Sequence, residues 1–235
     1  MIDIHSHLLP KVDDGPSSND EFLVLLNDYV DNGVTDILCS PHYKANRFEM
    51  DTESIKNQFN ESCEFALKMG VRLHLWREVM VDSNTVTNLK RGSIVKENTP
   101  LLIEFKPSIE FDEYYLEDLL YSLKLYSSTV VLAHVERYIN FSFKNIERLS
   151  EMGYKLQVNS NGLLGNDGKS KSKKIKKLLK KELISYIGSD IHKVYQKVNL
   201  ALCKKEISKY LSAEYVEKLF KGNQEELLKE LYRED

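Results

Sequence analysis

Short apolar runs alternate with amphipathic segments along the whole chain. The runs are rich in Val, Ile and Leu, as are strands buried in parallel sheets. They predict strands over residues 1–4, 34–39, 71–77, 100–105, 128–132, 154–158 and 184–188. The amphipathic segments predict helices over residues 20–32, 52–69, 113–126, 143–152 and 171–182, with two or more further helices between 194 and 232. This alternation favours right-handed crossovers and a parallel sheet, so we expect an α/β fold, either a barrel or a doubly wound open sheet.

Local signals support several of these boundaries. The run Ser17-Ser18-Asn19-Asp20 offers N-cap side chains before the first helix. Asn32-Gly33 and Met69-Gly70 each have the pattern of a helix that ends at glycine before a strand. The first strand is followed by His-Ser-His and not by a Gly-rich turn, which argues against a dinucleotide or P-loop site. Because the sequence contains no internal repeat or long linker, we expect a single domain over residues 1–235.

Composition and charge narrow the class of protein. Hydrophobic residues make up 42% and charged residues 29%, as in ordinary globular proteins. The net charge of −3 provides no bulk basic field for nucleic acid. No apolar run approaches the roughly 20 residues of a membrane helix. The N-terminus lacks the charged and apolar regions of a signal peptide, so we expect none.

The three cysteines are Cys39, Cys63 and Cys203, and they lie far apart in the sequence. They predict neither a disulfide framework nor a thiolate zinc site, which fits a reduced, cytoplasmic compartment. None of them is followed six positions later by Arg, so the chemistry of cysteine phosphatases is excluded.

Residues 169–181 form an unusually basic segment. One interpretation is a solvated helix face, with Ile175, Leu178 and Leu179 turned toward the core. The alternative is a docking patch for an acidic or phosphorylated partner, or for an anionic membrane surface.

Histidines and acids follow the predicted strands. His5 and His7 lie two residues apart after the first strand, so in extended backbone both side chains point to the same side. In parallel α/β folds the carboxyl ends of the strands form one face, where active sites lie. Nine candidate metal ligands should meet there: His5, His7, Asp14, His42, Glu78, Glu104, His134, Asp190 and His192. Five imidazoles and four acids are too many for a single ion, so we expect two or three ions that share bridging carboxylates.

Four residues in or near this set have individual expectations. Glu104 lies in Leu-Leu-Ile-Glu-Phe, where a carboxylate is costly unless it is paired or metal-bound. His74 lies inside a predicted strand, away from its end, and is expected to be structural. Asp3 is expected to support the ligands. Asp13 could replace Asp14 as a ligand, and the sequence does not separate the two.

The motifs Asp3-Ile4-His5-Ser6-His7, Asp13-Asp14-Gly15, Ser40-Pro41-His42, Ile103-Glu104-Phe105, His134-Val135-Glu136-Arg137 and Ser189-Asp190-Ile191-His192 occur in this order. They resemble those of the polymerase and histidinol phosphatase (PHP) superfamily. More narrowly, the chain resembles the manganese-dependent protein-tyrosine phosphatases of capsular and exopolysaccharide loci in Gram-positive bacteria. The resemblance covers nearly the whole chain and implies a distorted (β/α)7 barrel that holds three metal ions.

The resemblance also implies roles for individual residues. His5, His7, Glu78 and Asp190 would hold the first ion; Glu78, Glu104 and His134 the second; and Asp14, His42 and His192 the third. Arg137 resembles the family's phosphate-binding arginine. A second arginine usual in the family is replaced by Lys197, which keeps the charge but not the two-pronged hydrogen bonding. Arg77, beside Glu78, is unusual for the family and is expected to turn away from the ions.

The implied reaction is hydrolysis of phosphotyrosine by a water molecule that the ions activate. Arg137 would bind the phosphoryl oxygens, and a bound water or His42 would supply any proton that the leaving group needs. Manganese is the expected metal, with iron, zinc or magnesium as alternatives. The implied substrate is the phosphorylated, tyrosine-rich tail of a membrane-associated bacterial tyrosine kinase, so the enzyme would be cytoplasmic and close to that kinase.

Three other functions stay open at this point. The first is a small-molecule phosphatase of the histidinol-phosphate type, which the Asp13-Asp14-Gly15 loop and Glu104 disfavour. The second is a metal-dependent nuclease or proofreading module, which the negative net charge disfavours. The third is a non-catalytic PHP binding protein with a degenerate site, an alternative that rests on Lys197. The oligomeric state is not predicted.

Overall fold

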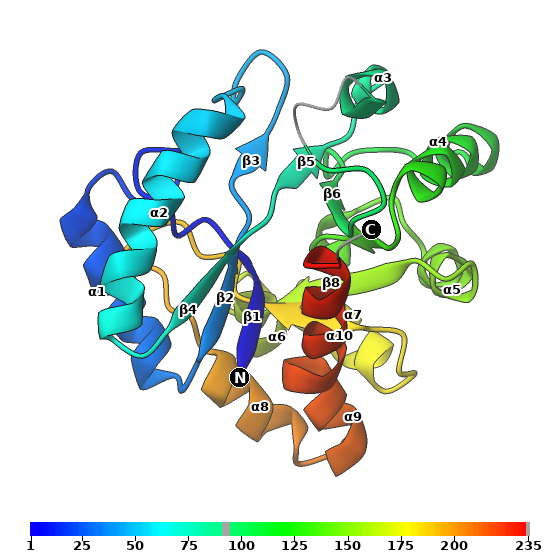
Figure 1. Cartoon of the computed structure of the whole chain (residues 1–235). Coiled ribbons are helices and arrows are strands. Elements are labelled where there is room, and N and C mark those ends of the chain that lie inside the picture. Colours follow the sequence, from blue (N-terminus) through cyan, green and yellow to red (C-terminus); the bar gives the residue numbers. More distant parts are fainter. Residues whose placement is uncertain (91–94, 234–235) are drawn as a thin grey trace.

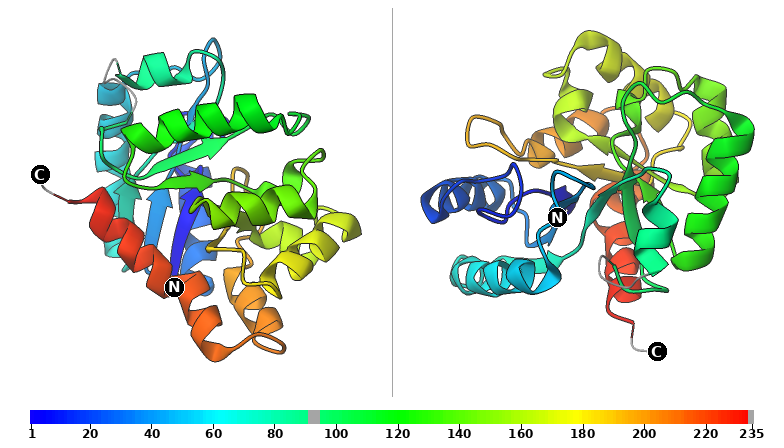
Figure 2. Two further views of the ribbon diagram at one scale, coloured as in Figure 1. Left: turned by 90° about the vertical axis from the view of Figure 1, so that its right-hand side faces the viewer. Right: turned by 90° about the horizontal axis from the view of Figure 1, so that it is seen from above.

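The computed structural model describes residues 1–90 and 95–233. Within these residues, every paired strand is parallel to its neighbours. The strands are β1 (Ile2–Ser6), β2 (Asp36–Cys39), β3 (His42–Tyr43), β4 (Arg72–Leu75), β5 (Glu78–Met80), β6 (Leu101–Glu104), β7 (Val130–Leu132), β8 (Lys155–Asn159) and β9 (Tyr186–Gly188). They form two sheets, of order β1-β2-β4 and β3-β5-β6-β7-β8-β9, with helices around the outside (Figures 1 and 2). The α/β class predicted from the sequence is therefore confirmed.

The strand predicted over residues 71–77 is confirmed as β4, but the sequence did not predict β5, which starts directly after this run and belongs to the other sheet. β4 pairs with β2 and ends at Leu75, whereas β5 starts at Glu78 and pairs with β3 and β6. The chain makes the same change of sheet between β2 and β3, around Pro41, which has no N–H to continue the ladder. As a result, His42 and Glu78 lie opposite each other in register.

The two sheets also meet where β1 faces the segment after β9. Ser6 and Ile191 form an isolated parallel bridge. The amide of Asp190 donates to the carbonyl of His5 at 2.8 Å, and the amide of His7 donates to the carbonyl of Ile191 at 3.0 Å. These bonds join the sheets at one point, but the hydrogen-bonded strands do not form one continuous closed sheet, so the expected (β/α)7 barrel is not confirmed in that form.

The helices cover the sheets and follow the predicted order. Their bounds are α1 (Asn19–Asp31), α2 (Thr52–Lys68), α3 (Thr85–Lys90), α4 (Glu113–Tyr126), η1 (Val135–Arg137), α5 (Phe143–Glu151), α6 (Ser160–Leu164), α7 (Lys169–Leu179), α8 (Leu200–Ile207), α9 (Ala213–Glu217), η2 (Lys218–Gly222) and α10 (Asn223–Leu231). The side chain of Ser18 caps α1, and Gly33 and Gly70 follow α1 and α2 with positive φ, as expected. The short helices α3 and α6 were not predicted.

Strand residues alternate between two apolar layers. Leu101 and Ile103 of β6 belong to the larger cluster, which includes the buried faces of the surrounding helices. Leu102 points the other way, into a smaller cluster that also contains Ile4 and Leu227. α10 therefore covers this smaller cluster. None of the described helices combines the length and apolarity that a bilayer crossing requires.

Candidate metal centre

The first group of predicted ligands lies at the end of β1, at the start of β5 and after β9. The Nε2 atoms of His5 and His7 are 3.2 Å apart. Oε2 of Glu78 lies 3.2 Å from each of them, and Oδ1 of Asp190 lies 3.4 and 3.5 Å away. All four side chains are buried. Four ligand atoms thus converge on one point, as the parity of His5 and His7 predicts.

The second group is built around the carboxylate of Glu78, whose two oxygens face different partners. Oε2 lies 3.1 Å from Nδ1 of His42, and Oε1 lies 3.1 Å from Nε2 of His134. Glu104 faces both imidazoles, at 3.5 Å from His42 and 3.6 Å from His134. Glu78 therefore has the geometry of a bridging ligand between the first group and the second.

The third group lies nearest to solvent. Oδ1 of Asp14 is 3.5 Å from Nε2 of His42 and 3.5 Å from Nε2 of His192. The ring of His192 stacks on that of His7, with their centroids 3.9 Å apart. Because the side chain of Asp14 is 40% exposed, this group is the open side of the cluster. The structure thus brings together all nine candidate ligands, from positions 5 to 192 of the sequence.

The donor set fits divalent cations. Oε2 of Glu78, Oδ1 of Asp190, Oδ1 of Asp14 and Nδ1 of His42 are buried atoms without a hydrogen-bond partner. Orphaned buried polar atoms are costly, and here they all face the cluster. Ligand atoms bound at about 2.0–2.2 Å lie roughly 3.0–3.5 Å apart in tetrahedral or octahedral coordination, which matches the spacing described above.

Hydrogen bonds orient the imidazoles toward the cluster. Oδ2 of Asp13 accepts from Nδ1 of His7 at 2.7 Å and from the amide of His42 at 2.9 Å. Oε1 of Gln157 accepts from the amide of His134 at 2.6 Å and faces Nδ1 of His5 at 3.2 Å. Protonation at Nδ1 leaves the Nε2 lone pairs of His5 and His7 free for a cation. Asp13 therefore supports a ligand, while Asp14 has the ligand geometry.

A further layer of polar contacts holds these groups in place. As expected of a supporting residue, Asp3 accepts hydrogen bonds from the hydroxyl of Tyr29 and from the amides of His5 and Ser189. Nδ2 of the Asn159 side chain donates to Oδ2 of Asp190 at 2.7 Å. The backbones of His134 and Asp190 have φ values of 34° and 52°, in the left-handed region that few residues adopt.

Burial and neighbouring charges shift the pKa values of the clustered groups. Burial and the charge of Glu78 raise the pKa of Glu104 to about 8. Burial alone would lower the pKa of His7, but the carboxylates of Asp13 and Glu78 raise it well above the ordinary value. Burial also opposes ionisation of Asp13, but protonated His7 lowers the pKa of its carboxyl to about 2. Metal binding would displace the protons that the raised pKa values of His7 and Glu104 favour, so that metal affinity would depend on pH.

Two cationic side chains contact the cluster or the loop beside it, those of Arg137 and Lys193. Arg137 of η1 places Nη2 2.6 Å from Oδ2 of Asp190 and keeps a third of its side chain exposed. Lys197 is exposed, and its carbonyl accepts a hydrogen bond from Asn161. Nζ of Lys193 donates to the carbonyl of Gly15 at 2.9 Å, so it lies at the Asp13-Asp14-Gly15 loop. The sequence analysis missed Lys193, although its place directly after His192 was an available signal.

The remaining two predictions concern His74 and Arg77, which were not expected to be ligands. His74 contacts Asp36 at 3.0 Å and the hydroxyl of Tyr232 at 2.9 Å, apart from the ligands, as expected for a structural histidine. Arg77 is buried, with Nη2 3.3 Å from the carbonyl of His42 and its guanidinium over the ring of Tyr43. Burial lowers the pKa of Arg77 to about 10. Among the residues described, its guanidinium contacts this backbone and ring and not a candidate ligand carboxylate.

Comparison with known proteins identifies the family. The sequence profile described as "Capsular polysaccharide synthesis, CpsB/CapC" matches residues 1–229. The chain belongs to the CpsB/CapC family. Its match therefore includes all nine clustered residues and the basic segment.

Individual relatives agree with this assignment. CapC of Staphylococcus aureus is 33% identical over 201 residues, which cover 83% of this chain and 78% of CapC. The tyrosine-protein phosphatase CpsB of Streptococcus pneumoniae is 29% identical over 203 residues, with 82% and 83% coverage. Among solved structures, one from a study of YwqE of Bacillus subtilis and CpsB of Streptococcus pneumoniae, described as metal-dependent tyrosine phosphatases, superposes with a TM-score of 0.87. It is 24% identical, and the match covers 97% of this chain and 94% of that one. This CpsB/CapC chain therefore shares its fold with that structure.

Proposed function

We propose that this CpsB/CapC protein is a metal-dependent phosphomonoesterase that hydrolyses phosphotyrosine in proteins. The observation that carries the proposal is the convergence of nine imidazole and carboxylate ligands next to the exposed edge of Arg137. The names of the relatives support the same activity.

Three divalent cations fit the three groups, and manganese suits the mixture of imidazole and carboxylate donors. In this proposal His5, His7, Glu78 and Asp190 hold one ion, Glu78, Glu104 and His134 another, and Asp14, His42 and His192 the third. When bound, such ions lower the pKa of water and neutralise phosphoryl oxygens.

The chain's own residues bind the phosphate and orient the ligands. The fork of Arg137 binds phosphoryl oxygens and stabilises the charge that develops on them. Lys193 and Lys197 add positive charge from the segment after His192, but as point charges without the fork of arginine. Asp13 and Gln157 hold the rings of His7 and His5 in one tautomer.

The proposed leaving group needs little help from a proton donor. Tyrosine has an ordinary pKa of about 10, so a phenolate leaves with less protonation than an alkoxide would need. Both ring nitrogens of His42 face carboxylates, Glu78 on one side and Asp14 on the other. This geometry favours His42 as a ligand over His42 as the proton donor.

The proposed substrate is the phosphorylated, tyrosine-rich tail of a membrane-associated kinase of polysaccharide synthesis, in the cytoplasm. The family's link to capsular polysaccharide supports the pathway, and the three free thiols of Cys39, Cys63 and Cys203 suit a reducing compartment. The exposed side of Asp14 offers a mobile tail access to the cluster. We also propose that the two sheets, bridged at Ser6 and Ile191, act as one distorted barrel of the PHP type.

One experiment tests the activity and separates it from the alternatives. The purified protein is analysed for bound metal and assayed on a phosphotyrosyl peptide and on histidinol phosphate, with and without manganese. We expect bound divalent metal and manganese-dependent hydrolysis of the peptide. Preference for histidinol phosphate would replace the proposal with a small-molecule phosphatase, and metal binding without hydrolysis of either would indicate a binding protein.

A further inference from the structure

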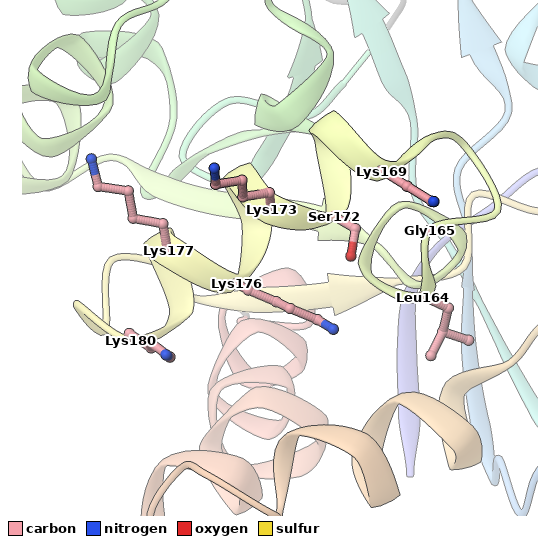
Figure 3. A pocket seen from close by; sticks show the side chains of 8 residues that line it. All are labelled: Leu164, Gly165, Lys169, Ser172, Lys173, Lys176, Lys177 and Lys180. Atoms are coloured by element: carbon pink, nitrogen blue, oxygen red, sulfur yellow. The ribbon is translucent and has the colours of Figure 1, made fainter.

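A basic groove lies along one face of α7. It has a volume of about 650 Å³ and is lined by five lysines, namely Lys169, Lys173, Lys176, Lys177 and Lys180 (Figure 3). We call it the α7 groove. It opens beside Leu164 and Gly165, at the end of α6. The prediction that the apolar residues of this segment face the core is confirmed, because Ile175, Leu178 and Leu179 are fully buried.

The positive charge of the α7 groove is largely unpaired. Residues 169–181 contain no acid, although the chain as a whole is negatively charged. Among the ion pairs between described residues, one involves this segment, that of Lys176 with Glu206 at 3.7 Å. Lys177 and Lys180 lie over the rings of Phe143 and Tyr210. Lys169 and Lys173 are exposed and form no ion pair within the part of the chain that the structure describes, so their charges are available to an anion.

The α7 groove leads away from the metal centre. α6 follows the carboxyl end of β8, where the ligands gather, and α7 runs from there toward the start of β9. Lys174, on the same helix, donates to the carbonyls of Val135 and Tyr138 at 3.3 and 2.9 Å, on either side of Arg137. α7 is thereby fixed to the segment that carries the phosphate-binding arginine. From Lys169 to Lys180 the helix rises by roughly 16 Å, which about five residues of extended peptide would span.

We propose that the α7 groove binds an acidic or phosphorylated stretch of the same protein chain whose phosphotyrosine enters the metal centre. This inference rests on the proposed function and adds a second binding site for that substrate. A membrane surface fits the observations less well, because helices that lie in a bilayer interface expose large apolar side chains. Those of α7 are buried, and its described exposed face consists of lysine and serine.

The test compares two peptide substrates and one small one. The peptides carry one phosphotyrosine, flanked in the first by a run of glutamates and in the second by neutral residues; the small substrate is p-nitrophenyl phosphate. We expect the double variant Lys169→Glu/Lys173→Glu to lose about fivefold or more in kcat/KM on the acidic peptide at low salt. Its kcat/KM on the other two substrates should stay within twofold of that of the unmodified protein.

A matched control and a binding assay complete the test. The double variant Lys56→Glu/Lys229→Glu makes the same charge change at exposed sites on α2 and α10 and should leave all three substrates unaffected. Fluorescence anisotropy of the acidic peptide with unphosphorylated tyrosine measures docking even if no substrate is hydrolysed, so failure of the proposed function is seen separately. Equal losses on all substrates, or unchanged binding of the acidic peptide, would overturn the inference. It is also overturned if the variant loses only its binding to vesicles of phosphatidylcholine and phosphatidylserine.

Discussion

The Nε2 atoms of His5 and His7 face each other at 3.2 Å in a fully buried site. Two imidazole lone pairs at this distance repel each other unless a proton or a cation lies between them. Oε2 of Glu78 lies 3.2 Å from both, so it completes a set of three donors around one point. In the proposed centre Glu78 therefore acts as a charge and not only as a hydrogen-bonding group.

Replacement of this carboxylate by the amide of similar shape should disable the centre. In Glu78→Gln we expect turnover of phosphotyrosyl peptide to fall by about 1,000-fold or more, because a bridging anion is lost. Bound metal, measured on the purified protein, should fall with it, while the circular dichroism spectrum is unchanged. Glu61→Gln, on the exposed face of α2, is the control. Near-normal activity in Glu78→Gln would contradict the assignment of Glu78 as a bridging ligand.

Arg137 should act on phosphate and not on metal. We expect Arg137→Ala to reduce kcat/KM for phosphotyrosyl peptide by about 100- to 1,000-fold, since a charged donor to the transition state is removed. Arg137→Lys should recover part of that loss, because the charge returns without the fork. Metal content separates this role from a structural one through the contact with Asp190. Loss of bound metal in both variants would show that Arg137 maintains the centre instead.

Lys197 offers a gain-of-function test. If it stands in for the family's second arginine, Lys197→Arg should raise kcat/KM by about three- to tenfold through two-pronged hydrogen bonding to phosphate. The rise should appear with a small aryl phosphate as well as with a peptide. The control is Lys205→Arg, at an exposed position on α8, which should leave kcat/KM unchanged. No gain in Lys197→Arg would remove Lys197 from the phosphate site and leave Lys193 as the cation after His192.

Asp13 should control metal affinity although it is not a proposed ligand. In Asp13→Asn the charged acceptor of the His7 ring is lost, and we expect the affinity for manganese to fall by about 10- to 100-fold. Titration against a chelating indicator measures this directly. Saturating manganese should restore most of the activity, which it would not do for a true ligand variant such as Glu78→Gln. Asp31→Asn, at the exposed end of α1, is the control.

Asp36 should make stability depend on pH in the acid range. Burial opposes its ionisation, but Arg72, His74 and Thr35 lower its pKa from 3.8 to about 2. A group whose pKa is lower in the folded state adds stability above its unfolded pKa and loses it as the pH falls through the folded value. From pH 4 to pH 2 we therefore expect the free energy of unfolding to lose about 2 kcal/mol that Asp36→Asn does not lose.

Urea unfolding of the metal-free protein at several pH values checks this prediction, because removal of metal keeps the ligand cluster from contributing a metal-linked change. Asp118→Asn, exposed on α4, should follow the unmodified protein. The prediction would be contradicted if the free energy of unfolding of Asp36→Asn fell between pH 4 and pH 2 by as much as that of the unmodified protein.

The positions of the candidate ligands were predictable because strand ends are visible in the sequence. Apolar runs stop just before His5, His42, His134 and Asp190, and parallel strands bring such ends to one face. The separation of Asp13 from Asp14 was not predictable, because two adjacent carboxylates in a loop differ only in direction. Gln157 was missed although it is a polar residue inside an apolar strand, since such residues occur for many reasons.

The division of the fold into two sheets was also beyond the sequence. The run over residues 71–76 predicts β4, whereas β3 and β5, of two and three residues, are too short to show a pattern of their own. Tertiary pairing places these strands in different sheets, because β4 pairs with β2 whereas β5 pairs with β3. The helices α3 and α6 are too short to show a period. Long, strongly periodic elements such as α2 and α4 were predicted almost to the residue.

The first and last residues of the metal cluster, His5 and His192, are separated by most of the chain. A growing polypeptide therefore carries the earliest of these side chains long before the latest has been translated. The cluster cannot be completed until β9 has joined β1, because a chain that ends before Asp190 lacks both Asp190 and His192. Under the proposed function, activity would therefore appear only late in biosynthesis, once β1 and the segment after β9 have come together.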